Sequence, residues 1–352
     1  MISRRNFLKT SALTLGGMSL PSLISCAGGN EKQAAAEAAP APKEFIGLQT
    51  YSLGSELAAD VPGGLAKVKS FGYTDLELAG YNNGRIHAGY GDGDEGYAPA
   101  DYKKLCDDLG LNILSAHLGT PSQYKTPEAE FTEAWKKTVE DHVTVGCTYI
   151  VDPSMPQCAT IDEVKQACDR FNLAGKICKE AGIQFGYHNH NNEFTKLATP
   201  EQIKEKREEI IEMMKKRFPQ MKPTDEMING MMRRNAPGTM YEQLYMDNTD
   251  PELVCFQLDV YWCMIGDQDP CEWITEHSDR IKLLHIKDRW IIGDSGMMNW
   301  KNIFTRAKAV GIKHFFVELE SDPKGRKQFE GVEKSAQFLA SQDYVWQSTY
   351  PS

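Results

Sequence analysis

Residues 181–190, AGIQFGYHNH, contain the pattern that decides the fold. A helical segment ends at an apolar residue, a glycine follows, and a short apolar run comes next and closes with polar side chains. The pattern recurs in FGYTDLEL (71–78), LGLNILSAH (109–117), VGCTYIVDP (145–153) and VGIKHFFVELE (310–320). Glycine readily takes the positive φ that the residue after a helix requires. Each copy therefore indicates a helix that ends and a strand that begins.

The spacing of these copies fits one strand and one helix per repeat. The first four glycines, Gly72, Gly110, Gly146 and Gly182, are 38, 36 and 36 residues apart. Three further apolar runs complete the set: FIGLQTYSL from Phe45, LVCFQLDVYW from Leu253 and IKLLHIKD from Ile281. Nearly continuous apolar strands that alternate with helices favour parallel pairing with both faces covered. Eight such strands predict an α/β fold with a single (β/α)8 TIM barrel. A doubly wound open sheet is the alternative, but no Gly-rich phosphate loop follows the first strand.

One segment is too long for this repeat. Residues from about 195 to 250 carry charged and Met-rich helical patterns, and we predict a helical insertion after strand five, with two helices beside the barrel mouth. Its methionines would form either a flexible lid over a substrate or an ordinary packing or oligomer contact. The oligomer contact would make the protein a homo-oligomer.

The first 25 residues have the pattern of an export signal. SRRNFLK places two arginines before an apolar stretch that is too short and too rich in Gly and Ser for a membrane span, as in a twin-arginine signal. LISC then resembles a lipobox, which would make Cys26 the lipidated first residue of the mature chain. An uncleaved N-terminal anchor is the alternative. We expect an exported lipoprotein of the cell envelope, in the periplasm or outer membrane, that meets the membrane only through Cys26.

The rest of the chain divides into a tether and a folded domain. Residues 26–44 are rich in Ala and Pro and predict a flexible tether, and residues 45–352 form the barrel domain. Removal of residues 1–25 takes away three cations and no acids, so the net charge goes from −10 to −13. Such an acidic chain is a poor partner for nucleic acid. Eight cysteines besides Cys26 form no C-x-x-C pair, and we expect free, buried thiols rather than disulfides.

Polar side chains stand at the C-terminal ends of the predicted strands. They are Gln49 and Tyr51, Glu77, His117, Asp152, His188 and His190, Asp259, His285 with Lys287, and Glu318. Active sites of (β/α)8 barrels lie at this end of the barrel and take residues from several strands. We therefore expect the functional site here.

Three of these residues suggest a metal site. Asp259, His285 and Glu318 occur near the ends of three successive strands, and adjacent strands lie about 5 Å apart, so their side chains can converge on one ion. Carboxylates with an imidazole suit Mn²⁺, Zn²⁺, Co²⁺ or Fe²⁺. The fourth ligand should come from strand five or its loop. We expect Glu193 in that role, with His188 as the alternative ligand.

These residues resemble a known family, the xylose isomerase-like barrels that include sugar phosphate isomerases and epimerases. The resemblance runs from Phe45 to Leu339 and is carried by GLQTYSL, FGYTDLELAGY, LSAH, AGIQFGYHNHNNEF, DPELVCFQLDVYW and LLHIKD. Such proteins typically hold a divalent metal with Glu, Asp, His and Glu from strands five to eight. The last three positions correspond to Asp259, His285 and Glu318, whereas the strand-five glutamate is replaced by His188. This variant looks like an exported subgroup of sugar isomerase-like proteins and of metal-dependent lyases acting on 3-keto-glycosides.

The chemistry that such a site suits is proton abstraction next to a carbonyl. One divalent metal would polarise the carbonyl of a small, non-phosphorylated sugar, and His190 or His188 would take the proton. Lys287 and His117 are candidates to polarise substrate oxygens, although Lys287 could instead form a surface salt bridge with Asp288. Gln49, Glu77, Tyr51 and Trp262 complete the expected substrate contacts, the aromatic rings either stacking on sugar or packing in the core.

Three functions remain open at this point. The first is a metal-dependent sugar isomerase or epimerase, because reprotonation at another face or carbon gives an epimer or isomer. The second is a metal-dependent lyase or hydrolase of 3-keto-glycosides, because loss of a β-substituent gives a lyase. The third is a carbohydrate-binding lipoprotein without catalysis, which predicts sugar binding without metal.

Overall fold

The computed structural model describes residues 46–89, 95–320, 325 and 327–345. These residues fall in one compact unit. The expected signal, the tether and the Cys26 anchor lie outside the described residues. Within the described part, no helix combines the length and the hydropathy that a membrane crossing requires.

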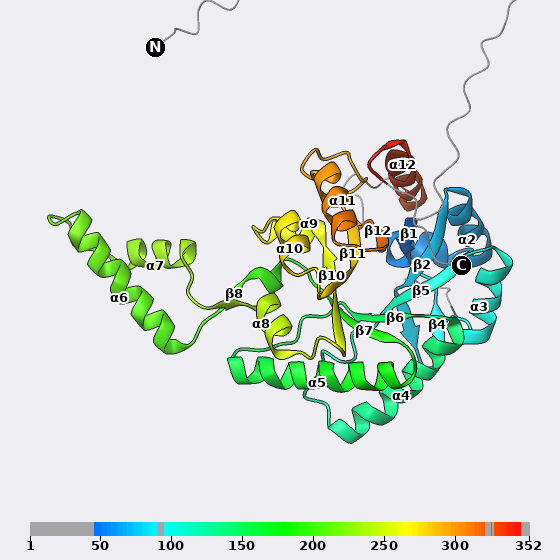
Figure 1. Ribbon diagram of the computed structural model, residues 1–352, viewed down its shortest axis with the longest axis horizontal. Helices are drawn as coiled ribbons and strands as arrows, with labels where there is room; N and C mark the ends of the chain where they lie inside the picture. Colours follow the sequence, from blue (N-terminus) through cyan, green and yellow to red (C-terminus); the bar gives the residue numbers. More distant parts are fainter. Residues whose placement is uncertain (1–45, 90–94, 321–324, 326, 346–352) are drawn as a thin grey trace, which may run out of the picture. The chain divides into compact units, whose positions relative to one another are not determined.

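Eight parallel strands close into a barrel (Figure 1). They are β1 (Ile46–Gln49), β2 (Tyr73–Leu78), β5 (Asn112–His117), β6 (Tyr149–Asp152), β7 (Gln184–His188), β10 (Val254–Asp259), β11 (Ile281–Lys287) and β12 (His314–Glu318). The hydrogen-bonded order is β1-β12-β11-β10-β7-β6-β5-β2, and β2 pairs back to β1. The predicted (β/α)8 barrel is confirmed, and all eight sequence runs supply its strands.

Helices connect the strands on the outside of the barrel (Figure 1). They are α1 (Gly54–Ala58), α2 (Val61–Ser70), α3 (Pro99–Asp108), α4 (Glu128–Val145), α5 (Ile161–Glu180), α8 (Tyr241–Asn248), α9 (Val260–Ile265), α10 (Pro270–Glu276), α11 (Trp300–Ala309) and α12 (Gln328–Ser341), with 3-10 turns η1 (Thr50–Leu53) and η2 (Asn192–Phe194). The repeat glycines that follow five helices all have positive φ, between 67° and 102°. The glycine pattern therefore marked true helix ends.

Two short antiparallel ribbons extend the loops beyond β2 and β7. The first pairs β3 (Gly80–Asn82) with β4 (Arg85–His87), and the second pairs β8 (Lys196–Leu197) with β9 (Thr239–Met240). Between β8 and β9 the chain forms α6 (Pro200–Arg217) and α7 (Asp225–Arg234), which Figure 1 shows at the far end of this ribbon. These two helices pack on each other around Ile210, Met214 and Ile228, a cluster separate from the barrel core.

The barrel interior changes from apolar to polar along the strands. Cys255, Leu283 and Phe316 form a buried apolar cluster inside it. A Cβ atom on Gly47 would lie 2.5 Å from the Phe316 ring, so only glycine leaves room for that ring. Further along, Asp259 lies opposite His285 in the strand register, and Lys287 lies opposite Glu318. Such a buried polar layer is unfavourable unless its groups are paired, which makes it the place to look for a site.

The expectation about cysteines is confirmed in the described part of the chain. All eight cysteines there are free, and all but Cys158 and Cys271 are fully buried. Burial also raises the pKa of the Cys178 thiol to about 12, which keeps it protonated and unreactive.

His142 should make the free energy of unfolding depend on pH. Its Nδ1–H donates to the Thr138 carbonyl at 2.7 Å, while Nε2 is buried without a hydrogen-bond partner among the described residues. Burial lowers the pKa of His142 to about 4, below the roughly 6.5 of an exposed histidine. The unfolded chain therefore binds this proton first as the pH falls, so stability should drop by up to about 3 kcal/mol from pH 6.5 to 4.

Urea unfolding at several pH values measures this effect. The variant His142→Gln carries no titratable group at this position, so it should lose this part of the pH dependence. An unfolding free energy that changes equally with pH in both proteins would rule out His142 as the source.

Candidate metal centre and active site

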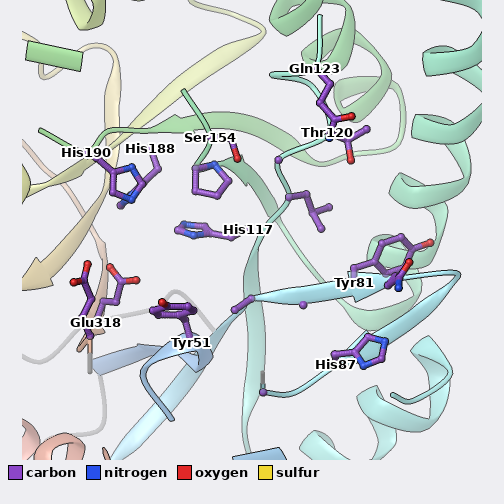
Figure 2. A pocket seen from close by; sticks show the side chains of 18 residues that line it. Tyr51, Tyr81, His87, His117, Thr120, Gln123, Ser154, His188, His190 and Glu318 are labelled. Atoms are coloured by element: carbon purple, nitrogen blue, oxygen red, sulfur yellow. The ribbon is translucent and has the colours of Figure 1, made fainter. Parts of the chain in front are cut away.

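A cavity of about 810 Å³ opens at the C-terminal ends of the barrel strands. Ligand pockets usually measure about 300–1,000 Å³, so this one accepts a small molecule easily. Figure 2 shows two groups of side chains around it. The inner group comprises Tyr51, His117, Ser154, His188, His190 and Glu318, and the outer group comprises Tyr81, His87, Thr120 and Gln123.

Four side chains converge at the inner end. One ligand atom each from His188, Asp259, His285 and Glu318 lies within 4.8 Å of the others. His188, Asp259 and Glu318 end the strands β7, β10 and β12, and His285 lies two residues before the end of the adjacent strand β11. His285 Nδ1 lies 3.1 Å from Glu318 Oε2 and 3.9 Å from Asp259 Oδ2. Two imidazoles and two carboxylates thus face one point.

Asp259 shows that this group fits a cation. Its Oδ1 accepts the Trp262 backbone N–H at 2.8 Å and caps α9, but its Oδ2 is buried with no hydrogen-bond partner among the described residues. Burial raises the pKa of Asp259 to about 7, and the neighbouring Glu318 carboxylate adds to the increase. A bound cation would give Oδ2 its missing partner. The nitrogen and oxygen donors suit Mn²⁺, Zn²⁺, Co²⁺ or Fe²⁺.

Glu193 lies outside this group of four. Its carboxylate accepts the Tyr187 hydroxyl at 2.9 Å and the His190 backbone N–H at 3.0 Å. Tyr187 precedes His188, so its side chain points to the opposite face of β7, toward the helices. The chain turns into η2 after the strand and takes Glu193 to that face. The structure therefore favours the alternative ligand, His188, over Glu193, which instead orients the loop that carries His190.

His285 is held between two carboxylates. Its Nε2 contacts Glu77 Oε2, and its Nδ1 faces Glu318. Burial alone would lower the pKa of His285, but the two carboxylates raise it to about 10. A metal-ligating histidine commonly donates its other N–H to a carboxylate, which fixes the ring. Glu77 is placed for that role when Nδ1 binds a cation.

Gln49 and Glu77 differ from the sequence-based expectation, which made both substrate contacts. Each is fully buried, and neither lines the cavity. Gln49 Nε2 donates to Glu77 Oε2 at 3.0 Å, and Gln49 Oε1 accepts the Tyr51 backbone N–H. Burial would raise the pKa of Glu77, but the rings of His117 and His285 hold it at about 2. The pair supports the group of four side chains from below, through the contact of Glu77 with His285.

Lys287 also differs from both sequence-based readings. Its ammonium is buried and lies 3.2 Å from Glu318 and 3.1 Å from Glu320, so it forms no surface salt bridge with Asp288. Burial would raise the pKa of Glu318, but Lys287 and the His285 ring hold it well below its usual value. Lys287 is absent from the cavity lining, and its contacts are with the carboxylates of Glu318 and Glu320.

The remaining expected residues divide between the cavity and its surroundings. His190, His117 and Tyr51 line the cavity, and Tyr51 is 45% exposed. Trp262 lies behind them, with its ring 6.0 Å from the His190 ring and 5.7 Å from the Lys287 ammonium. Trp262 therefore supports His190 and Lys287 and does not line the cavity.

Several residues in and around the cavity were not predicted from the sequence. Gln257, fully buried on β10, contacts His117, His188 and Glu77. Its position two residues before Asp259, on the same strand face, was the available signal. The outer lining residues escaped because they lie on the β3–β4 ribbon and on loops, where no repeat position identifies them. The methionines of α6 and α7 do not line the cavity, so the structure does not support a lid formed by these methionines.

Comparison with known proteins supports the family. Residues 65–216 match the family model of the xylose isomerase-like TIM barrel. The chain is 44% identical to a sugar phosphate isomerase/epimerase from Parabacteroides distasonis ATCC 8503, known from a crystal structure. The match covers 88% of this chain and 99% of that one, with a TM-score of 0.72. A second such protein from the same organism is 40% identical over 86% of this chain and all of its own, with a TM-score of 0.71.

More distant structures share the fold alone. The D-allulose 3-epimerase from Methylomonas sp., in complex with D-allulose, is 14% identical over 85% of this chain and 96% of its own, with a TM-score of 0.55. No curated protein matches the sequence of the chain. The two Parabacteroides proteins match along nearly their full lengths, and their identity is well above what shared fold alone produces. The chain belongs to the xylose isomerase-like TIM barrel family.

Proposed function

We propose that this protein is a sugar isomerase or epimerase that removes a proton next to the carbonyl of a non-phosphorylated sugar and needs one divalent metal ion. The observation that carries the proposal is the convergence of His188, Asp259, His285 and Glu318 at the inner end of the cavity. A divalent cation held there supplies Lewis acidity that polarises a carbonyl and stabilises the enediolate charge.

His190 is the base in this proposal. Its ring lines the cavity and lies 4.9 Å from the ring of the ligand His188. Burial lowers the pKa of His190, although the Glu193 carboxylate acts in the opposite direction. The ring is therefore neutral near pH 7 and can accept a proton from carbon. The Glu193 contact with the His190 backbone holds the ring in position.

The charge of the cavity lining favours a sugar without a phosphate group. None of its described lining residues is an arginine or a lysine, whereas Glu318 and Glu320 are among them. A phosphate would meet negative charge without a cationic partner. The expected export signal supports the same choice, because sugar phosphates are kept inside cells. The protein would then act in the cell envelope.

The size of the cavity favours a second candidate function. The lining extends from Glu318 to Tyr81 and His87, and the volume exceeds the needs of one sugar ring (Figure 2). A 3-keto-glycoside would place its keto sugar at the inner end and its substituent at the outer end. The same proton abstraction, followed by loss of the β-substituent, would make the protein a lyase.

Exchange of carbon-bound hydrogen in D₂O tests the proposal. Protein loaded with Mn²⁺ or Zn²⁺ would be incubated with free ketoses, aldoses and 3-keto-glycosides, and with phosphorylated sugars as controls, under NMR observation. We expect deuterium at the carbon next to the carbonyl of at least one non-phosphorylated compound. Product structure separates isomer, epimer and eliminated glycoside. Sugar binding without metal and without exchange would identify a carbohydrate-binding protein instead.

A further inference from the structure

Gln257 makes three hydrogen bonds inside the barrel. Its Oε1 lies 2.8 Å from His117 Nε2 and 3.1 Å from His188 Nδ1, and its Nε2 lies 2.8 Å from Glu77 Oε1. The residue is fully buried and does not line the cavity, so it contacts no substrate there. We propose that Gln257 is a positioning residue that fixes the tautomer of His188 and thereby directs the lone pair of its Nε2 to the cation. The second half of this inference rests on the proposed metal site.

The orientation of the Gln257 amide follows from Glu77. The Glu77 carboxylate lies among hydrogen-bond donors: its Oε2 accepts the Gln49 amide N–H at 3.0 Å and contacts the Nε2 atoms of His117 and His285, and an ionised carboxylate only accepts. The amide group that faces Glu77 must therefore be the NH₂ group. The reversed orientation would place two oxygens 2.8 Å apart in a buried site, without a proton between them. The amide oxygen is thus fixed on the side of the two histidines.

The tautomer of His188 follows from the amide oxygen. A carbonyl oxygen only accepts, so the Nδ1 of His188 that faces it must carry the proton. An imidazole that binds a cation is neutral, because the binding nitrogen must carry a lone pair and not a proton. A neutral ring with a proton on Nδ1 has its lone pair on Nε2. Because Nδ1 faces Gln257, Nε2 is the nitrogen that remains to bind a cation together with Asp259, His285 and Glu318.

This arrangement explains how a histidine replaces a carboxylate at the end of β7. A carboxylate offers lone pairs from either oxygen, whereas a neutral histidine offers one, on whichever nitrogen lacks the proton. A histidine at this place therefore needs a partner that selects the nitrogen. Gln257 lies opposite His188 in the parallel register of β7 and β10, where its amide reaches the ring. The pairing of β7 with β10 thus places Gln257 where it determines which nitrogen of His188 carries the proton.

The test uses Gln257→Met, which keeps the length of the side chain and removes the amide. The matched control is Gln184→Met, since Gln184 lies on β7 and its side-chain amide donates to the backbone carbonyls of Phe185 and Leu253, away from His188. The first readout is the ¹⁵N chemical shift of the His188 ring nitrogens in metal-free protein. The second is the dissociation constant for Mn²⁺ or Zn²⁺ alone, from a competition titration.

We expect wild type and the control to show a protonated Nδ1 and an unprotonated Nε2 on His188. Gln257→Met should show averaged or reversed signals, and its metal affinity should fall by about 10- to 100-fold, as for other partners of metal ligands. A proton on Nε2 in wild type would overturn the inference, as would an unchanged tautomer and an affinity within twofold in Gln257→Met. If wild type binds no metal, the proposed function fails, while the ¹⁵N signals still decide whether Gln257 sets the tautomer.

Discussion

Asp259→Asn should abolish metal binding while leaving the fold intact. Asparagine keeps the oxygen that accepts the Trp262 backbone N–H, so the cap of α9 survives. The second oxygen, which has no hydrogen-bond partner among the described residues, becomes an NH₂ group that cannot ligate a cation. Loss of a partner that only orients a metal ligand costs about 10- to 100-fold in affinity, and loss of a direct ligand should cost at least the upper value.

The measurement is a metal titration of Asp259→Asn beside Asp288→Asn. Asp288 is the control for general destabilisation, because it is also buried and its two oxygens accept the N–H groups of Arg289 and Gly293, so asparagine breaks one of these bonds. It does not belong to the group of four. The control should keep the affinity of wild type. Equal losses in the two variants would mean that the effect is general destabilisation, and unchanged affinity in Asp259→Asn would remove Asp259 from the ligand set.

His190→Gln should abolish turnover without removing the metal. A positioned general base contributes about 10²- to 10⁴-fold to the rate, and glutamine of similar size cannot accept the proton. His190 is not among the four grouped side chains, so the metal content should not change. The exchange rate in D₂O and the metal per chain are measured on the same sample.

His87→Gln is the control for this change. His87 lies on β4 and lines the outer part of the same cavity (Figure 2). Its replacement should change substrate binding more than the rate of proton removal. Exchange in His190→Gln within about tenfold of the wild-type rate would assign the base to another residue, since a true base contributes more.

The barrel could be predicted from the sequence because each repeat contains residues that mark where its helix ends and its strand begins. Each glycine marks a helix end by its positive φ, and each apolar run after it is a strand that is buried on both faces. The closing order of the strands then follows from their sequence order. Asp259, His285 and Glu318 could be placed together for the same reason, since they lie at or near the C-terminal ends of adjacent strands.

The differences between the expected and the observed site have two causes. Strand periodicity tells which face a side chain occupies only while the strand continues, and β7 ends at His188. Glu193 follows a turn and reaches the Tyr187 side of the strand. Gln49 and Glu77 point inward as expected, but the sequence does not show the depth of the cavity floor. They lie beneath it, hydrogen-bonded to each other.

The most direct measurement is the metal content per chain by elemental analysis, for wild type, His188→Ala and Glu193→Gln, after incubation with Mn²⁺ or Zn²⁺ and removal of free metal. The account predicts close to one metal ion per chain in wild type and in Glu193→Gln, and none in His188→Ala. Glutamine at position 193 keeps an oxygen for the Tyr187 hydroxyl, so this variant should fold. Absence of metal from wild type, or loss in Glu193→Gln with retention in His188→Ala, would contradict the proposed centre.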